Sequence, residues 1–119
     1  MTRSNDLDRL VEAITVDCYD EEEQMAAFHS VFSDEVALPT PTALLGIAVE
    51  VLGFDVREDG RELVALCRRP GSVAQQVSLA DLVFPPESVV GRLHAAYRRC
   101  LGLTPFPATI PPGWEPSWL

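Results

Sequence analysis

The spacing of apolar residues changes twice along this chain of 119 residues, and this change limits the folds that it can adopt. Apolar residues recur at helical spacing in residues 4–15 and 21–33 and again in residues 88–101, whereas residues 42–83 carry short apolar runs separated by turn signals. The first pattern is typical of amphipathic helices and the second of strands. We therefore predict an α+β domain. Two N-terminal helices and a C-terminal helix pack on a twisted antiparallel β-meander, which could curl into a small SH3-like, partly open barrel.

The second predicted helix has a clear start signal. Asp20 is a good N-cap residue, and Glu23 follows three positions later as in a capping box. Met25, Phe28, Val31 and Phe32 then recur at helical spacing. We expect this stripe to be buried against the rest of the domain.

The central segment predicts a meander of antiparallel strands. We expect strands at residues 42–45, 47–56, 62–68 and 73–79, with a short last strand at 80–84. Asp59-Gly60 predicts a tight hairpin turn because both residue types tolerate positive φ. Gly53 inside a strand pattern indicates a bulge.

Residues 1–103 are predicted to form one α+β domain, and residues 104–119 a tail rich in proline and tryptophan. The tail carries five prolines and the two tryptophans of the chain, Trp114 and Trp118. Proline-rich segments are extended, and tryptophans are rarely fully exposed. We expect the tail to pack along the domain with Trp114 or Trp118 buried; a disordered tail is the alternative.

The formal charge of −9 is unevenly distributed. Residues 1–62 hold fifteen acidic residues and four arginines, a net charge of −11, whereas residues 63–119 hold three and five, a net charge of +2. An acidic surface repels phosphate backbones, so we expect no nucleic-acid partner, whereas cations and basic proteins suit it. No apolar run approaches the roughly 20 residues of a membrane span, and the polar start is unlike a signal peptide. We expect a cytoplasmic protein that does not bind membranes.

The most concentrated charge lies in VDCYDEEEQ, residues 16–24. Asp17, Asp20, Glu21, Glu22 and Glu23 fall within seven positions, with no basic residue among them. Calcium takes six to eight oxygen ligands, mostly carboxylates and carbonyls, which this run could supply. Acidic residues in a first helical turn also stabilise a helix through its dipole, so an ordinary helix start is the competing interpretation.

The predicted hairpin turn offers a second, weaker candidate cation site, with Asp55 and Asp59 as ligands. The surrounding sequence does not match an EF-hand loop, because Arg57 and Leu66 stand where that loop needs acidic ligands. The residues also lie in a hairpin pattern instead of between two helices. We expect them to form mainly a solvated turn.

Catalysis has little support in the sequence. The three cysteines are far apart, which argues against a zinc site or a disulfide framework. Cys18 and His29 could pair as nucleophile and base, but nothing nearby signals an oxyanion hole or an orienting third group. We therefore expect His29 and His94 to be partly exposed helix residues and the protein to be no enzyme.

Several segments together resemble the CcbP-type calcium-binding proteins, small acidic bacterial proteins from cyanobacteria with relatives in actinobacteria. The similar segments are VDCYDEEEQ (16–24), IAVEV (47–51), LVALCRR (63–69), VSLADL (77–82) and AAYRRCLG (95–102). The chain is more similar to the actinobacterial relatives. The resemblance implies calcium binding without EF-hands, with Asp17, Asp20, Glu21, Glu22 and Glu23 in the matching acidic motif.

We therefore expect a non-enzymatic calcium-binding protein, either a buffer or a sensor, with Ca²⁺ as its ligand. The alternative is an interaction module whose acidic face binds a basic protein without any metal. Selectivity for Ca²⁺ over Mg²⁺ distinguishes the two, because a diffuse acidic face should treat both ions nearly alike.

Overall fold

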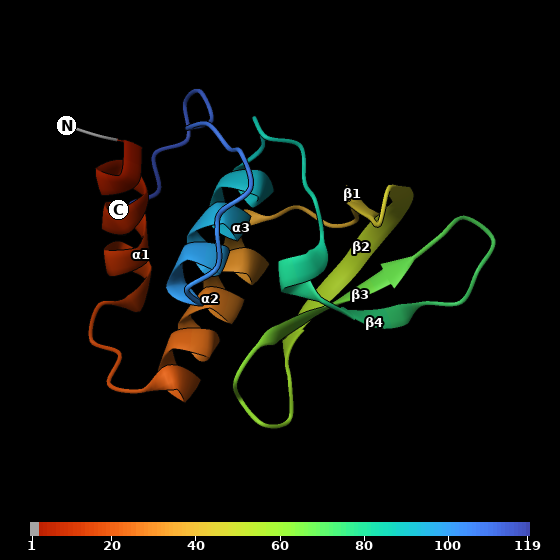
Figure 1. The fold of residues 1–119 in the computed structure, drawn as a ribbon, viewed down its shortest axis with the longest axis horizontal. Coiled ribbons are helices and arrows are strands. Elements are labelled where there is room, and N and C mark those ends of the chain that lie inside the picture. Colours follow the sequence, from red (N-terminus) through yellow and green to blue (C-terminus); the bar gives the residue numbers. More distant parts are fainter. Residues whose placement is uncertain (1–2) are drawn as a thin grey trace.

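The computed structural model describes residues 3–119 and contains three helices and one four-stranded antiparallel sheet (Figure 1). The predicted α+β class is confirmed. The elements in chain order are α1 (Arg3–Thr15), α2 (Glu21–Glu35), β1 (Thr40–Leu44), β2 (Ile47–Val56), β3 (Leu63–Arg68), β4 (Gln75–Ser78), the 3₁₀ turn η1 (Leu79–Asp81) and α3 (Val89–Cys100).

The sheet has the order β1-β2-β3-β4, so each strand pairs with its neighbour in sequence as a meander requires. The pairing of β2 with β3 shifts register between Val51 and Gly53, where the bulge was expected. The sheet stays open and does not close into a barrel, because β1 and β4 are its two edges. A single antiparallel bridge between Ala43 and Val83 brings the chain after β4 back to the edge of β1.

The expected short strand at residues 80–84 is wrong. Residues 79–81 form η1 instead, and only Val83 makes a bridge. Leu79 and Leu82 are both fully buried. Residues three apart point to opposite faces of a strand but to one face of a tight helical turn, so the turn buries both side chains together.

The core lies between the helices and the sheet, which occupy opposite sides of Figure 1. Phe28 and Phe32 from α2 meet Tyr97 of α3 edge to face, with ring centroids 5.6 and 6.3 Å apart. Phe32 also contacts the Phe54 ring of β2 at 5.1 Å. The predicted apolar stripe of α2 therefore packs against both α3 and the sheet.

Helix α3 is buried around most of its circumference, more than its sequence indicated. Every residue from Val90 to Tyr97 is buried. His94 is only 1% exposed, so the expectation of a partly exposed histidine is wrong at this position. Its Nε2 donates to the carbonyl of Leu79 at 2.8 Å, and its ring lies against Phe84 and Phe106. The segments on either side of α3 therefore cover the face that the sequence left open.

The C-terminal segment, residues 104–119, runs back over the helices, and its end lies beside α1 (Figure 1). Trp114 and Trp118 donate from Nε1 to the two carboxylate oxygens of Glu35, at 2.9 and 3.4 Å. The Arg98 guanidinium lies 4.1 Å from the centroid of the Phe106 ring and donates to the carbonyls of Thr104 and Ala80. No helix within residues 3–119 combines the length and apolar character needed to cross a membrane.

Candidate metal centre

The acidic run lies in the α1–α2 connection and the first turn of α2. Asp20 is the N-cap, and its Oδ1 accepts from the N–H of Glu23 at 2.8 Å, as its sequence position predicted. The carboxylate of Glu23 reaches back one residue further than in a standard capping box and accepts from the N–H of Tyr19 at 2.9 Å. Two acidic side chains of the run therefore hold the helix start in place.

Asp17 turns the chain between α1 and α2. Its φ of 65° lies in the left-handed region, which aspartate tolerates better than most residues. The N–H of Cys18 then donates to the carbonyl of Thr15 at 3.0 Å and ends α1. Asp17 is exposed, so it shapes the connection without being enclosed by it.

The β2–β3 turn forms where Asp59-Gly60 predicted it. Gly60 has a φ of 71°, and its N–H donates to the carbonyl of Arg57 at 2.8 Å. Asp59 Oδ1 accepts from the N–H of Arg61 at 3.0 Å, which orients its carboxylate on the turn. Arg57 and Glu62 pair across the base of the turn at 3.7 Å.

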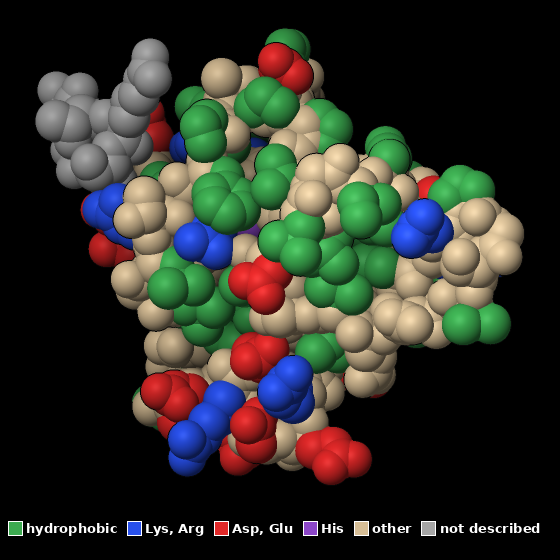
Figure 2. All heavy atoms as spheres, turned by 45° about the vertical axis from the view of Figure 1, so that its right-hand side comes forward, with side chains coloured by type: hydrophobic (Ala, Val, Ile, Leu, Met, Phe, Trp, Pro, Cys, Tyr) green, Lys and Arg blue, Asp and Glu red, His purple; other side chains and the backbone are tan. Residues whose placement is uncertain are grey.

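The turn and the start of α2, far apart in sequence, enclose a shallow hollow of about 330 Å³. Asp20, Glu21 and Glu22 line it from the helix, and Asp59 and Arg61 from the turn. The two parts are in close contact, because a Cβ placed on Gly60 would lie 2.9 Å from Cγ of Glu22. Figure 2 shows charged side chains of both signs gathered at this end of the molecule, the lower end of both views.

The structure brings together four of the seven predicted metal ligands: Asp20, Glu21, Glu22 and Asp59. Asp17, Glu23 and Asp55 are not among the residues that line the hollow. Asp55 Oδ1 accepts from the neighbouring N–H of Val56 at 2.8 Å. Within the part of the chain that the structure describes, no group of three or more His, Cys, Asp or Glu side chains is arranged so that it could hold a metal ion.

A cation in an open hollow of this kind would keep much of its water. Calcium accepts carboxylates, carbonyls and waters in a flexible geometry, so an open hollow can supply part of its ligands. Arg61 also lines the hollow and partly offsets the negative charge. Sequence reasoning missed Arg61; its position two residues after Asp59 on a tight turn was the available signal.

The possible nucleophile pair of Cys18 and His29 does not form. His29 Nε2 is hydrogen-bonded to the carbonyl of Phe54 at 3.0 Å. Burial and then the charges of Glu23, Asp17 and Asp20 raise the pKa of the Cys18 thiol. A raised pKa disfavours the reactive thiolate. The geometry around Cys18 therefore gives no support to catalysis.

Comparison with known proteins identifies a solved structure with a similar fold. No protein-family model matches the chain, and no curated protein is significantly similar to it in sequence. Among solved structures, the crystal structure of Anabaena CcbP is similar, with a TM-score of 0.72 over 87% of this chain and 97% of that one. The two chains share 18% sequence identity. This chain therefore has a CcbP-like fold.

Proposed function

We propose that this protein belongs with the CcbP-type proteins, on the side of their actinobacterial relatives, and binds Ca²⁺ as a non-enzymatic buffer or sensor. The observation that carries the proposal is the meeting of Asp20, Glu21 and Glu22 with Asp59 across one hollow. These carboxylates come from the start of α2 and from the β2–β3 turn, which we predicted as two separate acidic clusters. The CcbP-like fold and the VDCYDEEEQ resemblance support the same ligand.

The proposed ligands are Asp20, Glu21, Glu22 and Asp59, with waters completing the shell. Asp20 has Oδ2 free because only Oδ1 caps the helix. With an open hollow and Arg61 on its wall, we expect an affinity weaker than about 10⁻⁷ M, in the range of sensors or weaker sites. Asp17, Glu23 and Asp55, which we also predicted as ligands, do not line this hollow.

The test is calorimetric titration of the metal-free protein with Ca²⁺ and, at matched ionic strength, with Mg²⁺. The informative variant is the double substitution Asp20→Asn and Asp59→Asn. Asparagine also caps helices and also accepts in a tight turn, so this variant removes charge while keeping both local structures. The control is Asp34→Asn with Asp81→Asn, which removes the same charge from exposed positions outside the hollow.

The site would be supported by saturable, Ca²⁺-selective binding that the Asp20/Asp59 variant loses and the control variant keeps. Selective binding that survives the hollow substitutions would move the site, and Asp17→Asn and Asp55→Asn would then be tested. Equal weak responses to both ions would contradict the calcium proposal.

The second candidate is an acidic module that binds a basic protein partner. It rests on the exposure of Glu21, Glu22 and Asp59, none of which forms an ion pair with another described residue. In that case the acidic face would respond nearly alike to Ca²⁺ and Mg²⁺. Salt would weaken its complex with the basic partner.

A further inference from the structure

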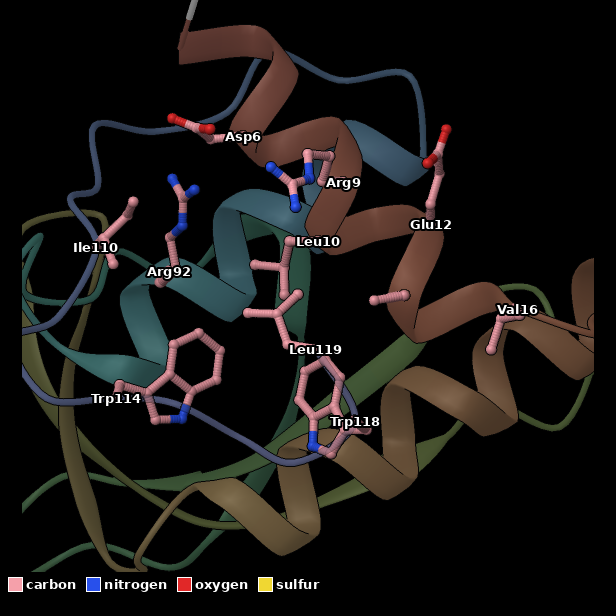
Figure 3. A pocket seen from close by; sticks show the side chains of 11 residues that line it. Asp6, Arg9, Leu10, Glu12, Val16, Arg92, Ile110, Trp114, Trp118 and Leu119 are labelled. Carbon is pink, nitrogen blue, oxygen red and sulfur yellow. The ribbon is translucent and has the colours of Figure 1, made fainter.

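A larger hollow, of about 590 Å³, lies on another part of the molecule, between α1, Arg92 of α3 and the C-terminal segment (Figure 3). Its volume falls within the range of small-molecule sites, about 300–1,000 Å³. None of the residues that line it lines the acidic hollow. We call it the tryptophan pocket.

Most of the tryptophan pocket is apolar. Leu10 of α1 lies opposite Trp114, Trp118 and Leu119 of the C-terminal segment. The two indole rings are 6.1 Å apart at their centroids and nearly perpendicular. Because Glu35 already accepts from both indole N–H groups, the rings can offer an occupant only apolar and aromatic contacts.

Arg92 is the exception to this apolar lining. The residue is only 9% exposed, and its guanidinium forms no hydrogen bond or ion pair with any other residue that the structure describes. The other arginines of α3 are occupied, since Arg98 donates to two carbonyls and Arg99 pairs with Asp8 at 3.0 Å. Within the described residues its nitrogens are not enclosed by protein, and the residue lines the pocket, so the guanidinium has unused capacity to bind an anion that enters there.

Three of the four charged side chains that line the pocket lie together at one end of it, and Glu12 lies apart from them (Figure 3). Figure 3 shows Arg92, Arg9 and Asp6 there, away from the ring of Trp118. Burial lowers the pKa of Arg92, and the charge of Asp6 raises it, although Asp6 is not at ion-pair distance. The charges of the two arginines and the two acidic side chains cancel over the whole lining, but at this end two arginines face Asp6 alone, so one negative charge is favoured there; Asp6 and the more distant Glu12 disfavour a second.

We propose that the tryptophan pocket binds a small organic monocarboxylate. Its carboxylate pairs with the guanidinium of Arg92, and its apolar body lies among Leu10, Trp114 and Trp118. A guanidinium matches a carboxylate in a bidentate geometry, and the apolar walls gain from burying the body. The proposal is independent of calcium, because the two hollows share no residue.

The probes are decanoate and decan-1-ol, which share a chain length and differ in charge, titrated in the presence of a calcium chelator. Tryptophan emission reports the pocket directly, because Trp114 and Trp118 are the only tryptophans of the chain. We expect saturable binding of decanoate, with a change in emission, and an affinity at least about tenfold higher than that of decan-1-ol. Equal affinities, or no saturable binding, would overturn the proposal.

Two variants locate the site. Arg92→Met keeps most of the length of the side chain. It should weaken the binding of decanoate at least about tenfold and change the binding of decan-1-ol little. Ala13→Trp fills the pocket from α1 and leaves Arg92 in place, so it should abolish binding of both probes even if Arg92→Met fails to fold. Arg57→Met, on the exposed β2–β3 turn, is the matched control. If Ala13→Trp binds decanoate as the wild type does, the decanoate site lies outside the tryptophan pocket, and the proposal is refuted.

Discussion

The hydroxyl of Tyr97 accepts a hydrogen bond of 2.7 Å from the backbone N–H of Leu63, which links α3 to the first residue of β3. Both residues are fully buried, so water cannot replace either partner. Burial raises the pKa of Tyr97 to about 12, and the nearby charge of Glu62 adds to this shift. The phenol is therefore neutral at any pH at which the protein is normally studied.

Replacing Tyr97 with phenylalanine should reduce the free energy of unfolding by about 1–3 kcal/mol, because the buried N–H of Leu63 would lose its acceptor. Urea denaturation measures this change. Tyr19→Phe is the control, since Tyr19 is 88% exposed and its loss of a hydroxyl should change stability by less than about 0.5 kcal/mol. Equal effects of the two substitutions would contradict the assignment.

His94 should make stability fall between about pH 6.5 and pH 4. Burial lowers its pKa from 6.5 to about 4, although its hydrogen bond to Leu79 opposes the shift. Within this window the unfolded chain takes up a proton that the folded chain does not, so unfolding becomes easier as the pH falls. The contribution to the free energy of unfolding is roughly 3 kcal/mol. This stability is present above pH 6.5 and is lost by about pH 4.

Unfolding free energies of the wild type and His94→Gln, measured across this window, test the effect. Glutamine keeps a donor for the Leu79 carbonyl and does not titrate, so the variant should show a flatter pH dependence. Parallel curves for the two proteins would mean that other groups control the acid sensitivity.

Gly91→Ala should destabilise the protein, although alanine normally favours helices. A Cβ at position 91 would overlap the backbone carbonyl oxygen of Pro85, and backbone cannot move aside as a flexible side chain can. We expect a loss of about 2–3 kcal/mol or more in the free energy of unfolding, against the usual gain of about 1 kcal/mol. Thermal unfolding measures the sign, and a stabilised variant would exclude this close approach.

Gly60→Ala should disturb the acidic hollow as well as the β2–β3 turn. The new methyl group would lie 2.9 Å from Cγ of Glu22, so the Glu22 side chain must move. Gly71→Ala is a matched control, because Gly71 has a similar φ of 77° and a methyl group there would have no atom within 4 Å. Each substitution should cost about 1–2 kcal/mol through its positive φ, but only Gly60→Ala should also weaken calcium binding.

Comparing Ca²⁺ affinity in these two glycine variants separates a local effect from general destabilisation. If both variants bind Ca²⁺ like the wild type, Glu22 is not a ligand and the proposed site must lie elsewhere in the acidic run.

Much of the local structure followed from residues close together in sequence. Asp20 and Glu23 determine where α2 begins, since a carboxylate at the cap satisfies N–H groups that no helical partner can reach. Asp59-Gly60 determines the β2–β3 turn, since both residues accept conformations that most side chains disfavour. Short-range hydrogen bonding and sterics are enough for both.

Other features were decided only by the tertiary structure. The burial of His94 depends on Phe84 and Phe106, which flank α3 from two different segments. The turn η1 formed because Leu79 and Leu82 had to be buried on one side. The hollow between Asp20 and Asp59 depends on how α2 packs on the sheet. Local preferences act between near neighbours in sequence, whereas these contacts depend on chain segments that only packing brings together.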